Sequence, residues 1–249
     1  MMPYTALTFW LLVLVLTAAG VHRLLSAVVR PKVLNAALLP GTLVAQLGHV
    51  LGLLITGATV RNNSLLGNDS WDPETTTDPK PRIPVVGPII IGMLPLMACG
   101  TAVLLVVQYV GGSVLARVRI EAVTAVLPTT LGGGWQLLRD LISLAESFVS
   151  AMLRADWTSW DTWLFAYLLT CLTIRMAPFP GTMRGSLGAT VVLGIAATAV
   201  GSLFATIHAQ VPTAWSLLNL TVAAAIVLLL LSLLVRAVTS LARLFARGA

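Results

Sequence analysis

Long apolar runs separated by short polar segments dominate the pattern of this chain. Two of the runs, residues 89–110 and 214–235, exceed the roughly 18 apolar residues that mark a membrane-spanning helix. Similar runs predict spans near residues 5–27, 35–58, 84–110, 160–177, 187–208 and 214–236. The pattern therefore predicts an all-α, polytopic transmembrane helical bundle of about six spans, with residues 1–249 forming a single integral membrane domain.

Two segments between the apolar runs have a different pattern. Residues 61–83 are rich in Asn, Asp, Thr and Pro, which predicts a polar extramembrane loop. Residues 131–155 carry polar side chains on one face of a helix and apolar ones at helical spacing on the other, namely Leu138, Leu141, Ile142, Ala145, Phe148, Val149 and Met152. This second segment is predicted to be an amphipathic interfacial helix that lies on the bilayer or on a partner.

Composition strengthens the membrane interpretation. Apolar residues make up 57% of the chain and charged residues only 10%, whereas soluble domains contain about 25% charged residues. The net charge is +6, but the basic residues are scattered at predicted helix ends, as expected for snorkelling anchors such as Arg175. No basic face for nucleic acid is evident, and the two cysteines lie within predicted spans without a CxxC motif. Arg outnumbers Lys, and both Ala and Leu are abundant. This composition favours a GC-rich bacterial genome and the bacterial inner (cytoplasmic) membrane.

One motif stands out in the second apolar run, residues 39–58, which reads LPGTLVAQLGHVLGLLITGA. It resembles the zinc-binding helix of site-2-protease-like intramembrane metallopeptidases. In that family the helix carries H-E-L-G-H, in which two histidines four residues apart bind Zn²⁺ and the glutamate accepts a proton from the bound water. In this chain Ala45 replaces the first histidine and Gln46 replaces the glutamate, so only His49 remains.

A later stretch, residues 175–185, is similar to the Pro-rich element in which the family places an aspartate ligand. Thr182 or Arg184 occupies that position, and no Asp or Glu follows Asp161 anywhere in the chain. The segment Pro84-Val85-Val86-Gly87-Pro88 also fits the family's layout. The resemblance therefore implies a degenerate, inactive member of the family, with no catalytic residue, no metal and no cofactor.

The same residues also have structural interpretations. Gly48 and Gly52 form a small-xxx-small pair that lets helices pack closely. His49 is a lone intramembrane histidine, for which packing or hydrogen bonding is the ordinary role, because one imidazole does not hold Zn²⁺. His22 and His208 are expected at the membrane interface.

These observations leave several functions open. The first is a non-catalytic pseudoprotease that acts as a binding or scaffold subunit, with the lipid bilayer and other membrane protein subunits as partners. The second is a cofactor or transport subunit, in which two of His22, His49 and His208 bind haem or the Pro-Gly helices line a solute path. The third is an active zinc peptidase that uses His49 with atypical ligands such as His22 and His208.

Overall fold

The computed structural model describes residues 2–57, 86–116, 130–177, 188, 190–192, 194–195 and 211–248. This part of the chain contains helices and turns but no β-strand. Three of its helices are long and apolar enough to cross a membrane, at Ala6–Ser26, Val86–Tyr109 and Trp215–Leu241. The predicted all-helical membrane architecture is therefore confirmed, whereas the predicted count of six spans is not supported.

The segments predicted as spans at 35–58 and 160–177 form helices that are shorter than the sequence predicted. The run at 35–58 is broken at Leu38, whose φ of −98° and ψ of 20° separate α2 (Pro31–Ala37) from α3 (Leu39–Ile55). At 1.5 Å per residue, the 17 residues of α3 and the 16 of α7 (Trp160–Arg175) measure only about 24–26 Å. A hydrocarbon core is about 30 Å thick.

The remaining predicted segments are outside the described residues in whole or in part. The polar loop at 61–83 falls entirely among residues that the structure does not describe. Of the predicted span at 187–208, residues 188, 190–192 and 194–195 are described, and all of them are helical.

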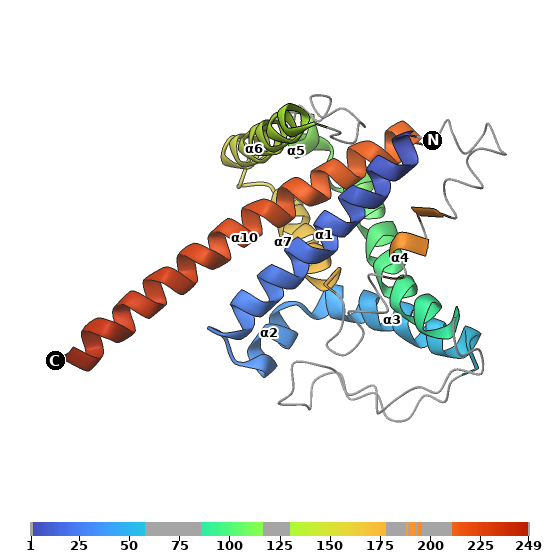
Figure 1. Cartoon of the computed structure of the whole chain (residues 1–249). Helices are drawn as coiled ribbons and strands as arrows, with labels where there is room; N and C mark the ends of the chain where they lie inside the picture. The colour runs from blue at the N-terminus through green and yellow to red at the C-terminus, as the bar shows by residue number, and fades with distance from the viewer. Residues whose placement is uncertain are drawn as a thin grey trace.

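The two ends of the chain form a pair of helices that lie side by side, α1 (Met2–Ser26) and α10 (Val211–Gly248) (Figure 1). The rings of Trp10 and Trp215 meet at a centroid distance of 6.1 Å. Further along the pair, a β-carbon added at Gly20 would lie 3.2 Å from Leu229, so the two helices stay in close contact. The 38 residues of α10 extend about 57 Å, and the helix continues past α1 (Figure 1).

A second pair consists of α3 and α4 (Val86–Tyr109), whose backbones approach each other at two glycines. A β-carbon at Gly48 would lie 2.6 Å from the carbonyl oxygen of Leu94 and 2.7 Å from the Cα of Pro95. A β-carbon at Gly52 would lie 3.0 Å from the Cα of Ile91. Only residues without a side chain allow backbones to pack at this separation.

The amphipathic segment forms α6 (Leu131–Leu153), which follows the short α5 (Gly112–Leu115). The hydroxyl of Thr130 accepts a hydrogen bond of 3.1 Å from the Gly133 amide and so caps the helix. The buried residues of α6 are Leu141, Leu144, Ala145, Phe148 and Ala151. Of the apolar positions singled out in the sequence, Leu138, Ile142 and Val149 are exposed in the described part of the chain. The face that packs on α10 is rotated relative to the sequence pattern, and an apolar strip remains uncovered by the described chain.

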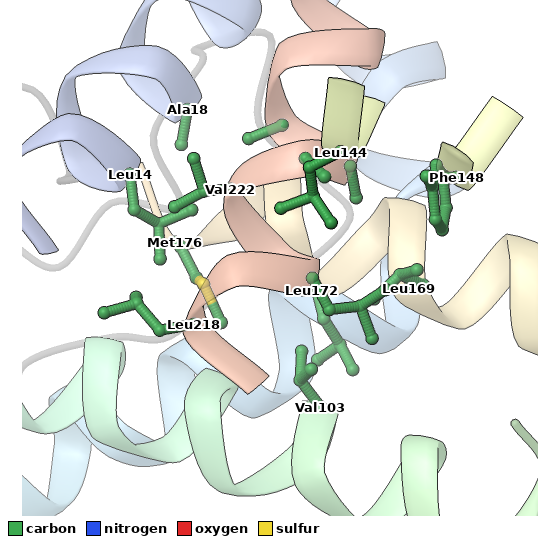
Figure 2. Packing of buried hydrophobic residues seen from close by; sticks show 14 of the residues in the cluster. Leu14, Ala18, Val103, Leu144, Phe148, Leu169, Leu172, Met176, Leu218 and Val222 are labelled. Carbon is green, nitrogen blue, oxygen red and sulfur yellow. The ribbon is translucent and has the colours of Figure 1, made fainter. Parts of the chain in front are cut away.

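The main apolar core collects buried side chains from α1, α3, α4, α5, α6, α7 and α10, and Figure 2 shows part of it around α10. Leu14 comes from α1, Val103 from α4, Leu144 from α6, Leu172 from α7 and Val222 from α10. Helices that are distant in sequence are therefore fastened to one another by a shared set of buried apolar side chains.

The approach of α3 to α4 makes a prediction about two glycines. Gly48→Ala should lower the free energy of unfolding by about 1–3 kcal/mol, because the added methyl group meets main-chain atoms that cannot move aside cheaply. Gly100→Ala is the matched control, since Gly100 lies in α4 with no atom within 4 Å of the added carbon. Thermal unfolding of the detergent-solubilised protein should show a lower Tm for the first variant only. Equal Tm values for both variants would contradict the close approach.

Candidate functional site on the buried face of α3

The motif residues lie on the buried face of α3, which consists of Gly41, Thr42, Ala45, Gln46, Gly48, His49, Gly52 and Leu53. Their spacing of three and four residues places them on one side of the helix. This face packs against α4 and α7, while Leu43, Leu47, Leu51 and Leu54 are exposed on the opposite side. The structure therefore brings Ala45, Gln46 and His49 together in the protein interior.

Ala45 and Gln46 take the positions of the first metal ligand and the general base in the resemblance. Ala45 has no exposed surface and belongs to the main apolar core. Gln46 is also buried, and its Nε2 has no hydrogen-bond partner among the described residues. A methyl group offers no lone pair to a metal, and a carboxamide is not a base at neutral pH. These two side chains supply neither function of the active family motif.

His49 is buried and makes a hydrogen bond to the backbone of Ile91 in α4. Pro95 lies inside α4 four residues after Ile91, at the position whose N–H would normally bond the Ile91 carbonyl. Proline has no N–H, so the helix cannot bond the carbonyl of the residue four positions earlier. Inside a membrane such a carbonyl needs a donor from a neighbouring helix. The imidazole of His49 provides that donor where Gly48 and Gly52 hold α3 against α4.

A second polar contact lies at the other end of α3 and centres on Arg175, the last residue of α7. The Arg175 side chain is only 5% exposed, so the predicted snorkelling role is wrong. Its Nη2 donates a hydrogen bond of 2.5 Å to the Oδ1 of Asn35 in α2. Nearby, the Tyr167 hydroxyl donates to the Ala37 carbonyl at 2.9 Å. These contacts fasten α7 to the junction of α2 and α3.

Asn35 is the residue of this site that the sequence did not single out. It is 6% exposed and lies three residues before the break at Leu38. The signal was an amide inside a run that was predicted to span the membrane, because buried polar groups in such runs require partners. The identity of the partner was not visible, since Arg175 is 140 positions away in the chain.

Of the three histidines considered as haem ligands, His22 and His49 are among the described residues, and they lie near different parts of α3. His22 lies near enough to Arg175 for their charges to interact, at the end of α3 that contains Gly41. His49 follows Gly41 by eight residues, which corresponds to about 12 Å along the helix axis. Two axial imidazoles must flank a single iron atom. His208, Thr182 and Arg184 lie outside the described residues.

The described residues contain no group of three or more His, Cys, Asp or Glu side chains placed to hold a metal ion. Cys99 and Cys171 are both buried free thiols, and the Cys99 Sγ lies 3.9 Å from the Arg175 carbonyl oxygen. Among the polar side chains described above, His49, Arg175 and Tyr167 join neighbouring helices.

Comparisons with known proteins give no further assignment. The chain matches no protein-family model, no curated protein and no solved structure. The likeness to site-2 proteases consequently depends on the residues of the α3 motif and of the Pro-containing segments.

The contact between His49 and Ile91 predicts an energetic coupling with Pro95. His49→Leu should destabilise the protein, because it removes the donor for a buried carbonyl. In a Pro95→Ala background the helix regains its own N–H, so the same change should cost less. A double-mutant cycle of unfolding free energies should give a coupling of about 0.6–1.7 kcal/mol, the range for hydrogen bonds between membrane helices. Additive effects would show that His49 does not serve this carbonyl, and His49→Gln should retain part of the stability.

The contact between Asn35 and Arg175 generates a separate prediction. Asn35→Ala removes an acceptor from a buried guanidinium and should lower the free energy of unfolding by about 1–3 kcal/mol. Val33→Ala is the control in the same helix, because Val33 is 57% exposed, and its effect should stay within about 0.5 kcal/mol. Chemical or thermal unfolding in detergent measures both. A similar loss of unfolding free energy in the two variants would show that Asn35 is not part of this site.

Proposed function

We propose that this chain is a non-catalytic, intramembrane-protease-like protein that serves as a binding or scaffold subunit of a membrane complex. The three long apolar helices make it a membrane protein. The bacterial inner membrane is the proposed location, on the basis of the Arg-rich, Lys-poor, Ala- and Leu-rich composition.

The observation that carries the proposal is the pair of residues beside His49, because Ala45 and Gln46 are buried and supply neither a metal ligand nor a base. In the active family this histidine is a metal ligand, and its imidazole must keep a nitrogen lone pair for Zn²⁺. In this chain its hydrogen bond to Ile91 meets a need that Pro95 creates inside α4. This hydrogen bond gives His49 a structural use, and a single imidazole supplies only one of the three protein ligands that a catalytic zinc site needs.

The surroundings of His49 support the same proposal. A hydrolytic zinc site needs three protein ligands and an open position for water. Ala45 is packed in the apolar core, and the neighbouring glycines bring α4 into backbone contact with this face of α3. A helix that once presented ligands to a substrate cleft would on this view have become an interhelical packing surface.

A partner surface is proposed on α6. Its exposed apolar side chains include Trp135 at 65%, Leu138 at 46% and Ile142 at 59% exposure. They recur at intervals of three and four residues, so they form one strip on the outside of the helix. Beside the strip, Arg139 is exposed and Asp140 is half-buried. An apolar strip with a charged border fits a second membrane protein at the edge of the bilayer.

Metal content and complex formation test the proposal together. Protein purified without a histidine tag should contain far less than one zinc per chain by elemental analysis. The double change Ala45→His and Gln46→Glu should gain some zinc but little peptidase activity, because no Asp or Glu follows Asp161 to complete the site. Zinc near one per chain in the wild type, lost in His49→Ala, would refute the non-catalytic assignment.

The scaffold role needs its own measurement. A membrane protein that copurifies in mild detergent should be lost when Leu138 and Ile142 are both changed to Ser, and retained when the exposed residues Leu233 and Leu234 of α10 are changed in the same way. Copurification of the partner with both variants would show that the partner does not bind through this strip of α6.

A further inference from the structure

The corner between α6 and α7 carries exposed indole rings next to exposed charges. Trp160 is 74% exposed and Trp163 is 56% exposed, and their spacing of three residues places them on one face of α7. Arg154, Asp156 and Asp161 are exposed close to these rings in the chain. From Asp161 to the last residue of α7 the helix contains no charged side chain. The charges therefore end where the uncharged part of α7 begins.

Hydrogen bonds hold this corner in one conformation. Trp157 Nε1 donates at 2.9 Å to the carbonyl of Met152, at the end of α6 where carbonyls lack helical partners. Trp163 Nε1 donates at 2.7 Å to the carbonyl of Trp157, and the two rings meet edge to face at a centroid distance of 4.8 Å. The Asp156 carboxylate accepts from the amide of Thr158 at 3.0 Å and from its hydroxyl at 2.6 Å. The exposed rings are thus presented by an ordered surface.

Contacts of α7 with α4 give the level of this corner. The 24 residues of α4 extend about 36 Å, so its two ends reach opposite surfaces of a hydrocarbon core about 30 Å thick. A β-carbon added at Gly111, just after α4, would lie 2.9 Å from the ring of Phe165. Inside α4, the Cys99 Sγ lies 3.9 Å from the carbonyl oxygen of Arg175. Hence α7 begins at the Tyr109 end of α4, where α5 and α6 also lie, and runs inward (Figure 1).

The exposed groups at this level have opposite requirements. A carboxylate is costly in hydrocarbon, which excludes the centre of the bilayer as the surroundings of Asp156 and Asp161. A cluster of exposed indoles is unfavourable in bulk water, because a large apolar surface stays hydrated. The headgroup layer satisfies both, since charges remain hydrated there while aromatic rings contact the upper acyl chains. Tyr109, which is 78% exposed at the end of α4, has the same amphipathic chemistry.

We propose that Tyr109, Trp160 and Trp163 form an aromatic anchor that binds the headgroup and glycerol layer of the bilayer. The anchor holds the corner between α6 and α7 at the membrane surface that the end of α4 reaches. Arg175, at the other end of α7, then lies within the thickness of the membrane at the level of Cys99. The anchor does not depend on the proposed scaffold function.

Spin-label depth measurements test the anchor. The full chain with Trp160→Cys is labelled with a nitroxide and reconstituted into phosphatidylcholine vesicles. Power saturation in electron paramagnetic resonance then compares collisions with oxygen, which concentrates in hydrocarbon, and with a water-soluble nickel chelate. Cys99 and Cys171 are 0% and 1% exposed, so the wild-type chain should take up little label and serves as the background control. The label at position 160 should lie in the headgroup layer.

Met97→Cys is the matched control. Met97 is 45% exposed on α4 and lies about 18 Å along the helix axis from Tyr109, so its label should lie deeper than the label at position 160 by about 10 Å or more. If Trp160→Cys does not fold, Trp163→Cys should give the same shallow depth.

Three results would overturn the proposal. Nickel collisions at position 160 as frequent as for a free label would place the corner in water. Oxygen collisions equal to those at position 97 would place it in hydrocarbon. Protection from both reagents would show that protein, and not lipid, covers the corner.

Discussion

The backbone contact of α3 with α4 at Gly48 and Gly52 is the constraint on which the rest of the site depends. It brings two helices closer than side chains would allow, and it does so next to Pro95, where α4 cannot satisfy its own carbonyl. His49 reaches Ile91 only because of this approach. The close packing of α3 on α4 and the hydrogen bond to the Ile91 carbonyl therefore occur at the same point of contact.

A similar arrangement operates at the opposite end of α3. Here Gly41 meets the carbonyl of Cys171, and the side chain of Arg175 passes beside it to reach Asn35. A buried guanidinium is costly in an apolar interior unless it has acceptors, so the amide of Asn35 stabilises both the charge and the turn between α2 and α3. The short helices α2, α3 and α7 are held by specific polar contacts, whereas α1 and α10 are joined mainly by apolar surface.

Under the proposed function, the two ends of this site explain how a protease-like helix persists without catalysis. Small and polar residues on one face of a membrane helix need neighbours. At one end of the site His49 of α3 bonds the proline-containing α4, and at the other end Arg175 of α7 bonds Asn35 of α2.

The sequence by itself determined the helical membrane class and the amphipathic character of α6, because these follow from composition and from the local spacing of apolar residues. It located the three long apolar helices but overcounted the spans, because apolar composition does not show where a helix breaks or ends. It also marked Gly48, Gly52 and His49 as residues with a role, although not what each would contact. Only the tertiary structure decided that α3 breaks from α2 at Leu38, that Arg175 is buried against Asn35, and which face of α6 packs on α10. The physical reason is that these outcomes depend on partners far away in the chain. Periodicity describes what a segment can bury, but the neighbouring helices decide what it does bury.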